Sequence, residues 1–200
     1  MKLNILKLAK LSKAFQKGHA DEIRDIILFG SVLRGKSEPG DIDILMLFNA
    51  KINRNIEYEF KKQASKIIKN LSLVSTTENM LYAPSFAARE AILFEGYSLI
   101  EKQFIASHYG FDSCGIFIYS TKKLKNVEKT KFYYALNGRR SSPGVIDSLK
   151  AIKLSDSMIS VPLENVEEAK EFFDQQNIEF KYVPSLLPSR LAKKRIIGKN

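Results

Sequence analysis

Residues 26–48 decide the fold, and they read Ile26-Ile-Leu-Phe-Gly-Ser-Val-Leu-Arg-Gly-Lys-Ser-Glu-Pro-Gly-Asp-Ile-Asp-Ile-Leu-Met-Leu-Phe48. An apolar run ends in Gly30 and Ser31, and a charged loop containing glycines follows. A second apolar run then opens with Asp41 and Asp43. Nearly continuous apolar runs are typical of strands buried on both faces. The stretch therefore predicts two core strands with a polar loop between them.

The two aspartates predict a metal site at the start of the second strand. Residues two apart in a strand point to the same face, so Asp41 and Asp43 place their carboxylates side by side. Like charges at this spacing repel, and burying them is costly without a compensating cation. Carboxylate oxygens together with phosphate oxygens suit Mg²⁺, or Mn²⁺ in its place.

The loop after the first strand predicts a phosphate site. Gly30 lets the backbone approach a phosphate closely, and Ser31 offers a hydroxyl and an amide. We expect Ser31 to begin a short helical turn, where N–H groups and the helix dipole favour anions. Arg34 and Lys36 lie in the same loop and either contact a nucleoside triphosphate or are simply solvated.

Each part alone is weak evidence for a site. A Gly-Ser pair after a strand is common, and an Asp-x-Asp pair at a strand start can serve only as a turn and cap. The ordered combination is more specific, with nine residues between Ser31 and Asp41.

The run from Leu28-Phe-Gly-Ser-Val-Leu-Arg-Gly to Gly-Asp-Ile-Asp-Ile-Leu45 resembles the signature of minimal nucleotidyltransferases of the DNA polymerase β superfamily. The resemblance extends over about residues 23–100. It implies a small mixed sheet with helices on one side, and transfer of a nucleoside monophosphate from an NTP, with ATP the first candidate, as pyrophosphate leaves. It also implies that Asp41 and Asp43 are catalytic metal ligands. Small proteins of this type often act as antitoxin-like partners that modify a helical toxin.

The sequence departs from the family pattern at the next strand. The family usually carries a third acidic residue there, but the matching position in Leu71-Ser-Leu-Val74 is Ser72. A hydroxyl is a poor metal ligand and cannot act as the general base for an attacking alcohol. Glu78, just beyond the strand, is a candidate replacement. The alternatives are a weakened enzyme, an enzyme with another base, or a domain that binds nucleotide without turning it over.

Periodicity and breaker residues predict an α+β chain with two domains and a tail. Residues 1–103 form the nucleotidyltransferase-like domain, 104–188 form a small α/β domain of βαβαβ type, and 189–200 form a flexible basic tail. In the first domain we expect helices at 2–17, 53–69 and 85–95, and strands at 23–29, 42–48, 71–75 and 97–100. In the second we expect strands at 115–119, 158–161 and 178–183, and helices at 126–136, 145–151 and 164–175.

The charge is concentrated at the two ends of the chain. The net charge is +10, and residues 1–20 and 183–200 contain basic side chains but no acid. A solvated helix face with a disordered tail accounts for this, and so does an electrostatic surface for RNA or DNA. Arg139 and Arg140, in a glycine-containing loop, are candidate nucleic-acid contacts. The nearby Phe132 and Tyr133 fit a core better.

The composition limits the compartment and the cofactors. No apolar run approaches the length of a membrane span, and the N-terminus does not have the pattern of a signal peptide. The single cysteine, Cys114, fits a reducing cytoplasm, and one Cys with two His makes zinc an unfavoured cofactor.

Two hypotheses about function follow from the sequence. One is a Mg²⁺-dependent nucleotidyltransferase acting on a protein, RNA or small molecule, and the other is a non-catalytic module that binds nucleotide or nucleic acid.

Overall fold

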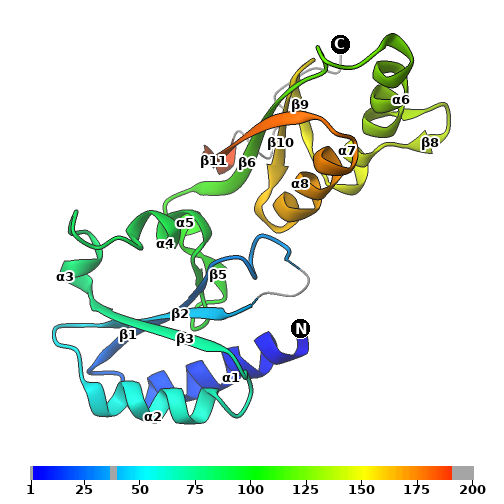
Figure 1. The fold of residues 1–200 in the computed structure, drawn as a ribbon. Coiled ribbons are helices and arrows are strands. Elements are labelled where there is room, and N and C mark those ends of the chain that lie inside the picture. Colours follow the sequence, from blue (N-terminus) through cyan, green and yellow to red (C-terminus); the bar gives the residue numbers. More distant parts are fainter. Residues whose placement is uncertain (1, 37–39, 191–200) are drawn as a thin grey trace. The chain divides into compact units, whose positions relative to one another are not determined.

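The computed structural model describes residues 2–36 and 40–190, and it gives side chains from residue 5 onward. The chain divides into two compact units (Figure 1). The first runs to Leu33 and resumes after Lys36 as far as Tyr109. The second contains Arg34–Lys36 and the chain from Gly110 onward. The expected basic tail lies outside the described residues from position 191.

The first unit is built on a mixed five-stranded sheet with the order β3-β2-β1-β4-β5. Strands β2 and β3 run parallel, and β1 pairs with β2 and β4 in antiparallel fashion. The strands predicted at 23–29 and 42–48 are confirmed. The bounds are β1 Ile23–Phe29, β2 Ile42–Phe48, β3 Leu71–Thr77, β4 Tyr97–Ser98 and β5 Gln103–Phe104.

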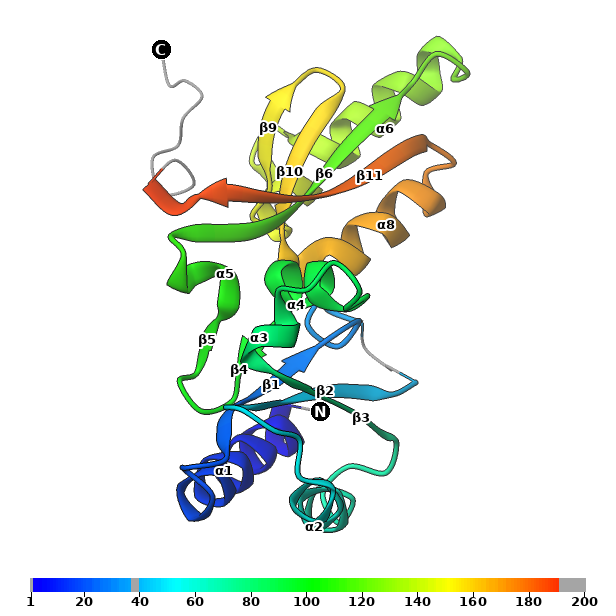
Figure 2. The same ribbon diagram turned by 90° about the vertical axis from the view of Figure 1, so that its left-hand side faces the viewer.

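Helices α1 (Lys2–Gly18) and α2 (Arg54–Ala64) cover one face of this sheet (Figures 1 and 2). Their apolar stripes join the inward side chains of β1 and β2 in a single core, and the Phe15 and Phe60 rings meet edge to face at 5.2 Å. The Asn53 side chain accepts a hydrogen bond from Asn55 N, which caps α2. The helix ends at Ala64, earlier than expected, because turns replace its last predicted residues.

The opposite face of the sheet is covered as well, so the expectation of helices on one side only is wrong. The short helices α3 (Glu78–Leu81), α4 (Arg89–Glu95) and α5 (Ile105–His108) lie there. Ile92 of α4 packs on Ile27, Leu45 and Leu47 in a second core cluster. Both faces of β1 and β2 are therefore apolar over most of their length, which explains the apolar runs at residues 26–29 and 44–48.

The second unit is an antiparallel sheet with the order β11-β6-β10-β9. The strands are β6 Phe111–Ser120, β9 Ile152–Ser155, β10 Met158–Pro162 and β11 Glu179–Pro188. The helices α6 (Asn126–Asn137), α7 (Val145–Ser148) and α8 (Val166–Gln175) follow β6 and β10, with a 3-10 turn at Leu163–Asn165. Helices α6 and α8 lie on one face of the sheet (Figure 2). Phe132 of α6 packs with Phe172 and Phe173 of α8 in the core.

The chain order in this unit is β-α-β-β-α-β, one strand more than the βαβαβ pattern expected. The additional strand, β9, has the alternating sequence Ile-Lys-Leu-Ser, but it is only four residues long and has no fully buried side chain. Residues 137–144 were expected to be a plain loop. They contain a small hairpin of β7 (Gly138–Arg139) and β8 (Ser142–Pro143). Pro184 lies inside β11, which is tolerated because β11 is an edge strand.

None of the helices in the described ranges is long and apolar enough to cross a bilayer.

Phe117 anchors the second core. It is fully buried, and its ring lies 5.4–5.6 Å from those of Phe173, Phe180 and Tyr182. We expect Phe117→Ala to lower the free energy of unfolding by about 3–5 kcal/mol, because it removes transfer energy and leaves a cavity. Ile118→Ala, the next residue and 39% exposed, is the matched control and should cost no more than about 1 kcal/mol. Urea unfolding followed by tyrosine fluorescence measures both, and equal losses would contradict this placement of the core.

Candidate nucleotide and metal site

The site begins where β1 ends beside the start of β2. Phe29 is the register partner of Asp43, so Gly30 follows directly beside that carboxylate. The φ of Gly30 is +89°, and a Cβ built at this position would lie 2.6 Å from Asp43 Oδ2. Glycine is therefore required at position 30 for two reasons. Its positive φ is strained for other residues, and a Cβ would collide with the Asp43 carboxylate.

Ser31 lies in a turn and does not begin a helix. Residues 31–35 form turns, and Leu33 N donates to Gly30 O at 3.1 Å. The expected helix N-terminus at Ser31 is therefore wrong, because the loop folds back too tightly to begin a helix. The half-buried Ser31 still presents its hydroxyl and amide in the turn that follows Gly30.

Asp41 lies just before β2, and Asn70 holds the backbone on both sides of it. The Asn70 side-chain amide donates to Gly40 O at 2.9 Å, and Ile42 N donates to Asn70 O at 2.8 Å. Asp41 is exposed and Asp43 is half buried. Asn70, directly before β3, therefore joins the start of β2 to the start of β3 through its side chain and its backbone.

The third strand offers no carboxylate beside the pair. Ser72 is the register partner of Asp43, as the resemblance implied for that position. Glu78 cannot replace it. Thr77 pairs with Phe48 at the other end of β2, which puts Glu78 about 20 Å from Ser72 along the strand. Across residues 2–36 and 40–190, no three His, Cys, Asp or Glu side chains gather closely enough to hold a metal.

The two basic residues of the loop differ in their contacts. Arg34 Nε donates to Glu167 Oε1 at 3.1 Å, and Lys36 is exposed. Burial raises the pKa of Glu167, but hydrogen bonds and charge from Lys170 and then Arg34 more than offset this and lower it. The nucleotide contact of Arg34 stays a prediction.

The sequence profile of the family described as polymerase beta, nucleotidyltransferase, matches residues 9–103. These residues are a nucleotidyltransferase domain of the polymerase β family. Among solved structures, a crystal structure of the mutant toxin–antitoxin MntA–HpeT is similar, at 18% sequence identity and a TM-score of 0.34. The match covers 43% of this chain and 67% of that chain, and so low a TM-score carries no argument. A comparison with curated proteins gave no match.

The nucleotidyltransferase domain contains another carboxylate, Asp25, which sequence reasoning missed because it lies inside an apolar strand. Ser98 Oγ and Ile26 N donate to Asp25 Oδ1 at 2.9 and 2.7 Å. Burial raises the pKa of Asp25 to about 6, although these two hydrogen bonds oppose the rise. Asp25 pairs with Leu47 in the register, four residues from the Phe29–Asp43 pair, so it is not part of the same site.

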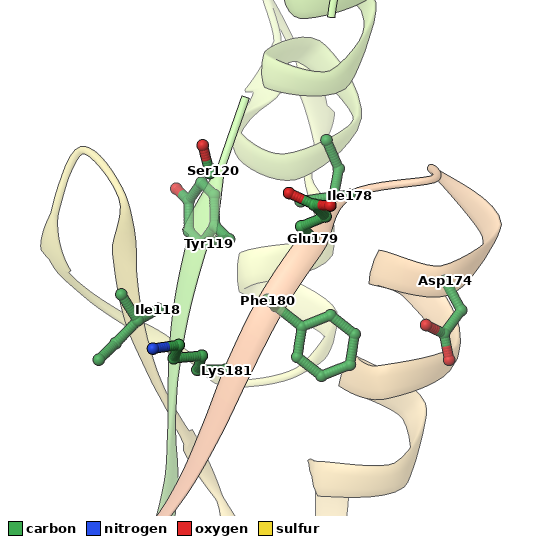
Figure 3. A pocket seen from close by; sticks show the side chains of 8 residues that line it. All are labelled: Ile118, Tyr119, Ser120, Asp174, Ile178, Glu179, Phe180 and Lys181. Atoms are coloured by element: carbon green, nitrogen blue, oxygen red, sulfur yellow. The ribbon is translucent and has the colours of Figure 1, made fainter. Parts of the chain in front are cut away.

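The second unit holds a surface pocket of about 840 Å³ (Figure 3). Asp174 lines it from α8, and Ile178 lines it from just before β11. The strands β6 and β11 supply the other lining residues, namely Ile118, Tyr119, Ser120, Glu179, Phe180 and Lys181. None of the residues that the sequence singled out lines this pocket.

Arg139 and Arg140 are also in the second unit, on the β7–β8 hairpin, and both are exposed.

We expect Asn70→Ala to loosen the backbone that carries Asp41. The substitution removes one hydrogen bond, worth about 1 kcal/mol, so amide exchange at residues 41–42 should accelerate about fivefold. Lys69→Ala, an exposed neighbour, should leave these rates unchanged. Hydrogen exchange with mass or NMR detection measures the difference, and unchanged rates in Asn70→Ala would show that the bridge does not hold Asp41.

Asp25 should make stability depend on pH. Its folded-state pKa of about 6 lies above the ordinary 3.8, so its contribution to stability is present below pH 4 and is lost as the pH rises through 6. Asp25→Asn keeps the acceptor for Ser98 and Ile26 without the buried charge. We expect this variant to gain up to about 3 kcal/mol over the wild type at pH 7.5, and nothing at pH 4. Urea unfolding at the two pH values measures this, and an equal effect at both would contradict it.

Proposed function

We propose that this protein is a nucleotidyltransferase that transfers a nucleoside monophosphate from an NTP to an acceptor hydroxyl and releases pyrophosphate. The observation that carries the proposal is the position of the Asp43 carboxylate against Gly30, with Asp41 two residues before it. This places a turn that can bind phosphate and two carboxylates at one end of the sheet, inside a domain of the polymerase β family.

The residues of the chain have separable tasks. The turn at Gly30 and Ser31 would bind the β- and γ-phosphates through its amides and the Ser31 hydroxyl. Asp41 and Asp43 would hold Mg²⁺, or Mn²⁺, whose charge when bound would offset that of the triphosphate. An exposed Asp41 and a half-buried Asp43 fit such a metal, since Mg²⁺ retains several waters and needs only one or two carboxylates.

The reaction itself is a displacement at the α-phosphorus. The acceptor oxygen bonds to it, the bond to pyrophosphate breaks, and the proton of the acceptor passes to solvent. Ser72 lies in register with Asp43, where a carboxylate would take up that proton. The chain therefore positions the nucleotide better than it activates the acceptor, and we expect slow transfer.

Ser72 also favours a second candidate function, a catalytically weakened domain that binds nucleotide or nucleic acid. Its support is that a hydroxyl, and not a carboxylate, lies in register with Asp43 on β3. The two candidates differ in one respect. Both require Asp41 and Asp43 for metal-dependent nucleotide binding, but only the enzyme transfers the nucleotide.

The acceptor is proposed as a protein, an RNA end or a small molecule, and ATP is the NTP to test first. A protein acceptor corresponds to the antitoxin-like role that the family resemblance implies. Cys114 is the single cysteine of the chain and is buried. We therefore propose a reducing, cytoplasmic setting.

The test uses full-length protein, each of the four α-labelled NTPs, Mg²⁺ and cell extract. Asp41→Asn/Asp43→Asn should lower label transfer at least about 100-fold, since metal-held charge is worth several kcal/mol in the transition state. The matched control is Glu90→Gln/Asp156→Asn, which removes two exposed carboxylates elsewhere and should transfer normally. Transfer that is unchanged in the aspartate variant would refute the enzyme proposal.

A gain-of-function variant separates the two candidates. Ser72→Asp restores a carboxylate in register with Asp43 and should raise transfer at least about tenfold, because general-base catalysis contributes on the order of 10²–10⁴. Ser75→Asp, further along β3, is its control. Nucleotide binding that depends on Asp41 and Asp43, without transfer by either the wild type or Ser72→Asp, would favour the binding module.

A further inference from the structure

The outer face of α6 and the β7–β8 hairpin carry basic and aromatic side chains that the proposed reaction does not use. Tyr134 is 45% exposed, and Lys131, Arg139 and Arg140 are exposed around it in sequence. Lys131 and Tyr134 are three residues apart and so lie on one helix face. We call these four residues the α6–hairpin surface; they belong entirely to the second unit (Figure 1).

Arg139 and Tyr134 form a stacked pair within this surface. The guanidinium carbon of Arg139 lies over the Tyr134 ring, 4.8 Å from its centroid. A guanidinium in this position is attracted by the ring face and is ordered without losing its donors. The pair therefore presents a flat π-surface and a positive charge together, while both side chains remain accessible to solvent.

Two glycines fix the hairpin against the end of α6. Gly138 has φ +83°, its N–H donates to Tyr134 O, and an added Cβ would lie 2.4 Å from Ser142 O. A Cβ at Gly144 would lie 2.3 Å from Gly138 N. This close packing restricts the backbone of the hairpin to one position relative to the end of α6. The backbone that carries its arginines is therefore preorganised for binding.

Arg140 stands at the tip of the hairpin in an unusual backbone conformation. Its φ of +54° is in the left-handed region, where glycine or asparagine is the ordinary choice. An arginine at such a position is not explained by the turn itself. It places an exposed arginine between the two strands of the hairpin, which suits a contact with an anion.

The nearby acids do not neutralise this surface. Glu128 accepts from Lys125 N at the other end of α6, and Asp147 accepts from Gly144 N. Within the part of the chain that the structure describes, no carboxylate forms an ion pair with Lys131, Arg139 or Arg140. These three charges are therefore available to an external partner.

We propose that the α6–hairpin surface binds single-stranded nucleic acid. A base stacks on the Tyr134–Arg139 pair, and Arg140 and Lys131 contact the flanking phosphates. This combination of an aromatic platform with basic side chains is how proteins hold single strands without reading their sequence. A duplex keeps its base faces stacked inside and cannot use the ring. A membrane surface needs more apolar contact than Val127 provides, since no other large aliphatic side chain is exposed on described α6.

The proposal goes beyond nucleotidyl transfer and does not rest on it. Its test is fluorescence anisotropy with labelled 15-nucleotide RNA and DNA single strands, their duplexes, and phosphatidylserine vesicles as a competitor. The assay contains full-length protein and neither NTP nor Mg²⁺. A failure of nucleotidyl transfer therefore cannot alter the result, and a failure of binding leaves the enzyme proposal intact.

The stacking and the charge contributions are separated by two sets of variants. Tyr134→Ala should weaken single-strand binding about tenfold with an unchanged salt dependence, whereas Tyr134→Phe should stay within about twofold. Arg139→Ala/Arg140→Ala should weaken binding at least about tenfold and reduce the slope of log K against log salt by about 1. Arg139→Lys keeps the charge but loses the flat stack, and should fall between the wild type and Arg139→Ala. Circular dichroism confirms that each variant folds.

The matched control removes two charges from another surface. Lys61→Ala/Lys62→Ala takes two exposed lysines from α2 and should bind within about twofold of the wild type. Equal losses in this control would show an effect of net charge alone and would overturn the proposal. So would unchanged binding in Tyr134→Ala, duplexes bound as tightly as single strands, displacement by the vesicles, or no binding at all.

Discussion

The close contact between Gly30 and the Asp43 carboxylate is the constraint on which the nucleotidyltransferase domain depends. It exists because β1 and β2 pair in antiparallel register with Phe29 opposite Asp43, and that register follows from burial of both strands on both faces. A slip of one residue would move Asp43 into the core on the α1 side. The same apolar packing that stabilises the sheet therefore also fixes which carboxylate lies beside the turn at Gly30, where we propose that phosphate binds.

Burial separates the roles of the carboxylates along these two strands. Asp25 is enclosed, and its raised pKa shows that the domain bears a free-energy cost for its charge at neutral pH. Asp41 and Asp43 lie at the open end of the sheet, where water or a cation can compensate two neighbouring charges. The position of a carboxylate along the strand thus decides whether its charge destabilises the domain or can bind a cation. Asn70, by fixing the backbone around Asp41, keeps that carboxylate at the open end.

The sequence predicted the parts of the fold that depend on long apolar runs. β1 and β2 matched residue for residue, and the Gly30 and Asp43 positions followed from them. It missed the Asn70 bridge, which joins residues distant in sequence and needs the parallel pairing of β2 with β3. It also missed two local features, the turn at Ser31 and the short strand β9, whose partner β10 follows it directly in the chain. A local pattern carries no information about a distant partner such as Asn70, so the site could be proposed from the sequence but not assembled.

Ser72 shows why evidence for a nucleotide-binding site is not by itself evidence for catalysis. Holding a triphosphate requires amides, a cation and two carboxylates, and in our proposal the turn at Gly30 and the carboxylates of Asp41 and Asp43 are the protein groups for this. Activating an acceptor requires a base at a third position, and the register shows that β3 offers a hydroxyl there. The binding parts share one strand pairing, whereas the base comes from a separate strand and can be lost without disturbing them. A chain can therefore keep the sequence signature of its family although the general base is missing. Its rate of nucleotidyl transfer then depends on water, or on a group of the acceptor molecule, to take up the proton.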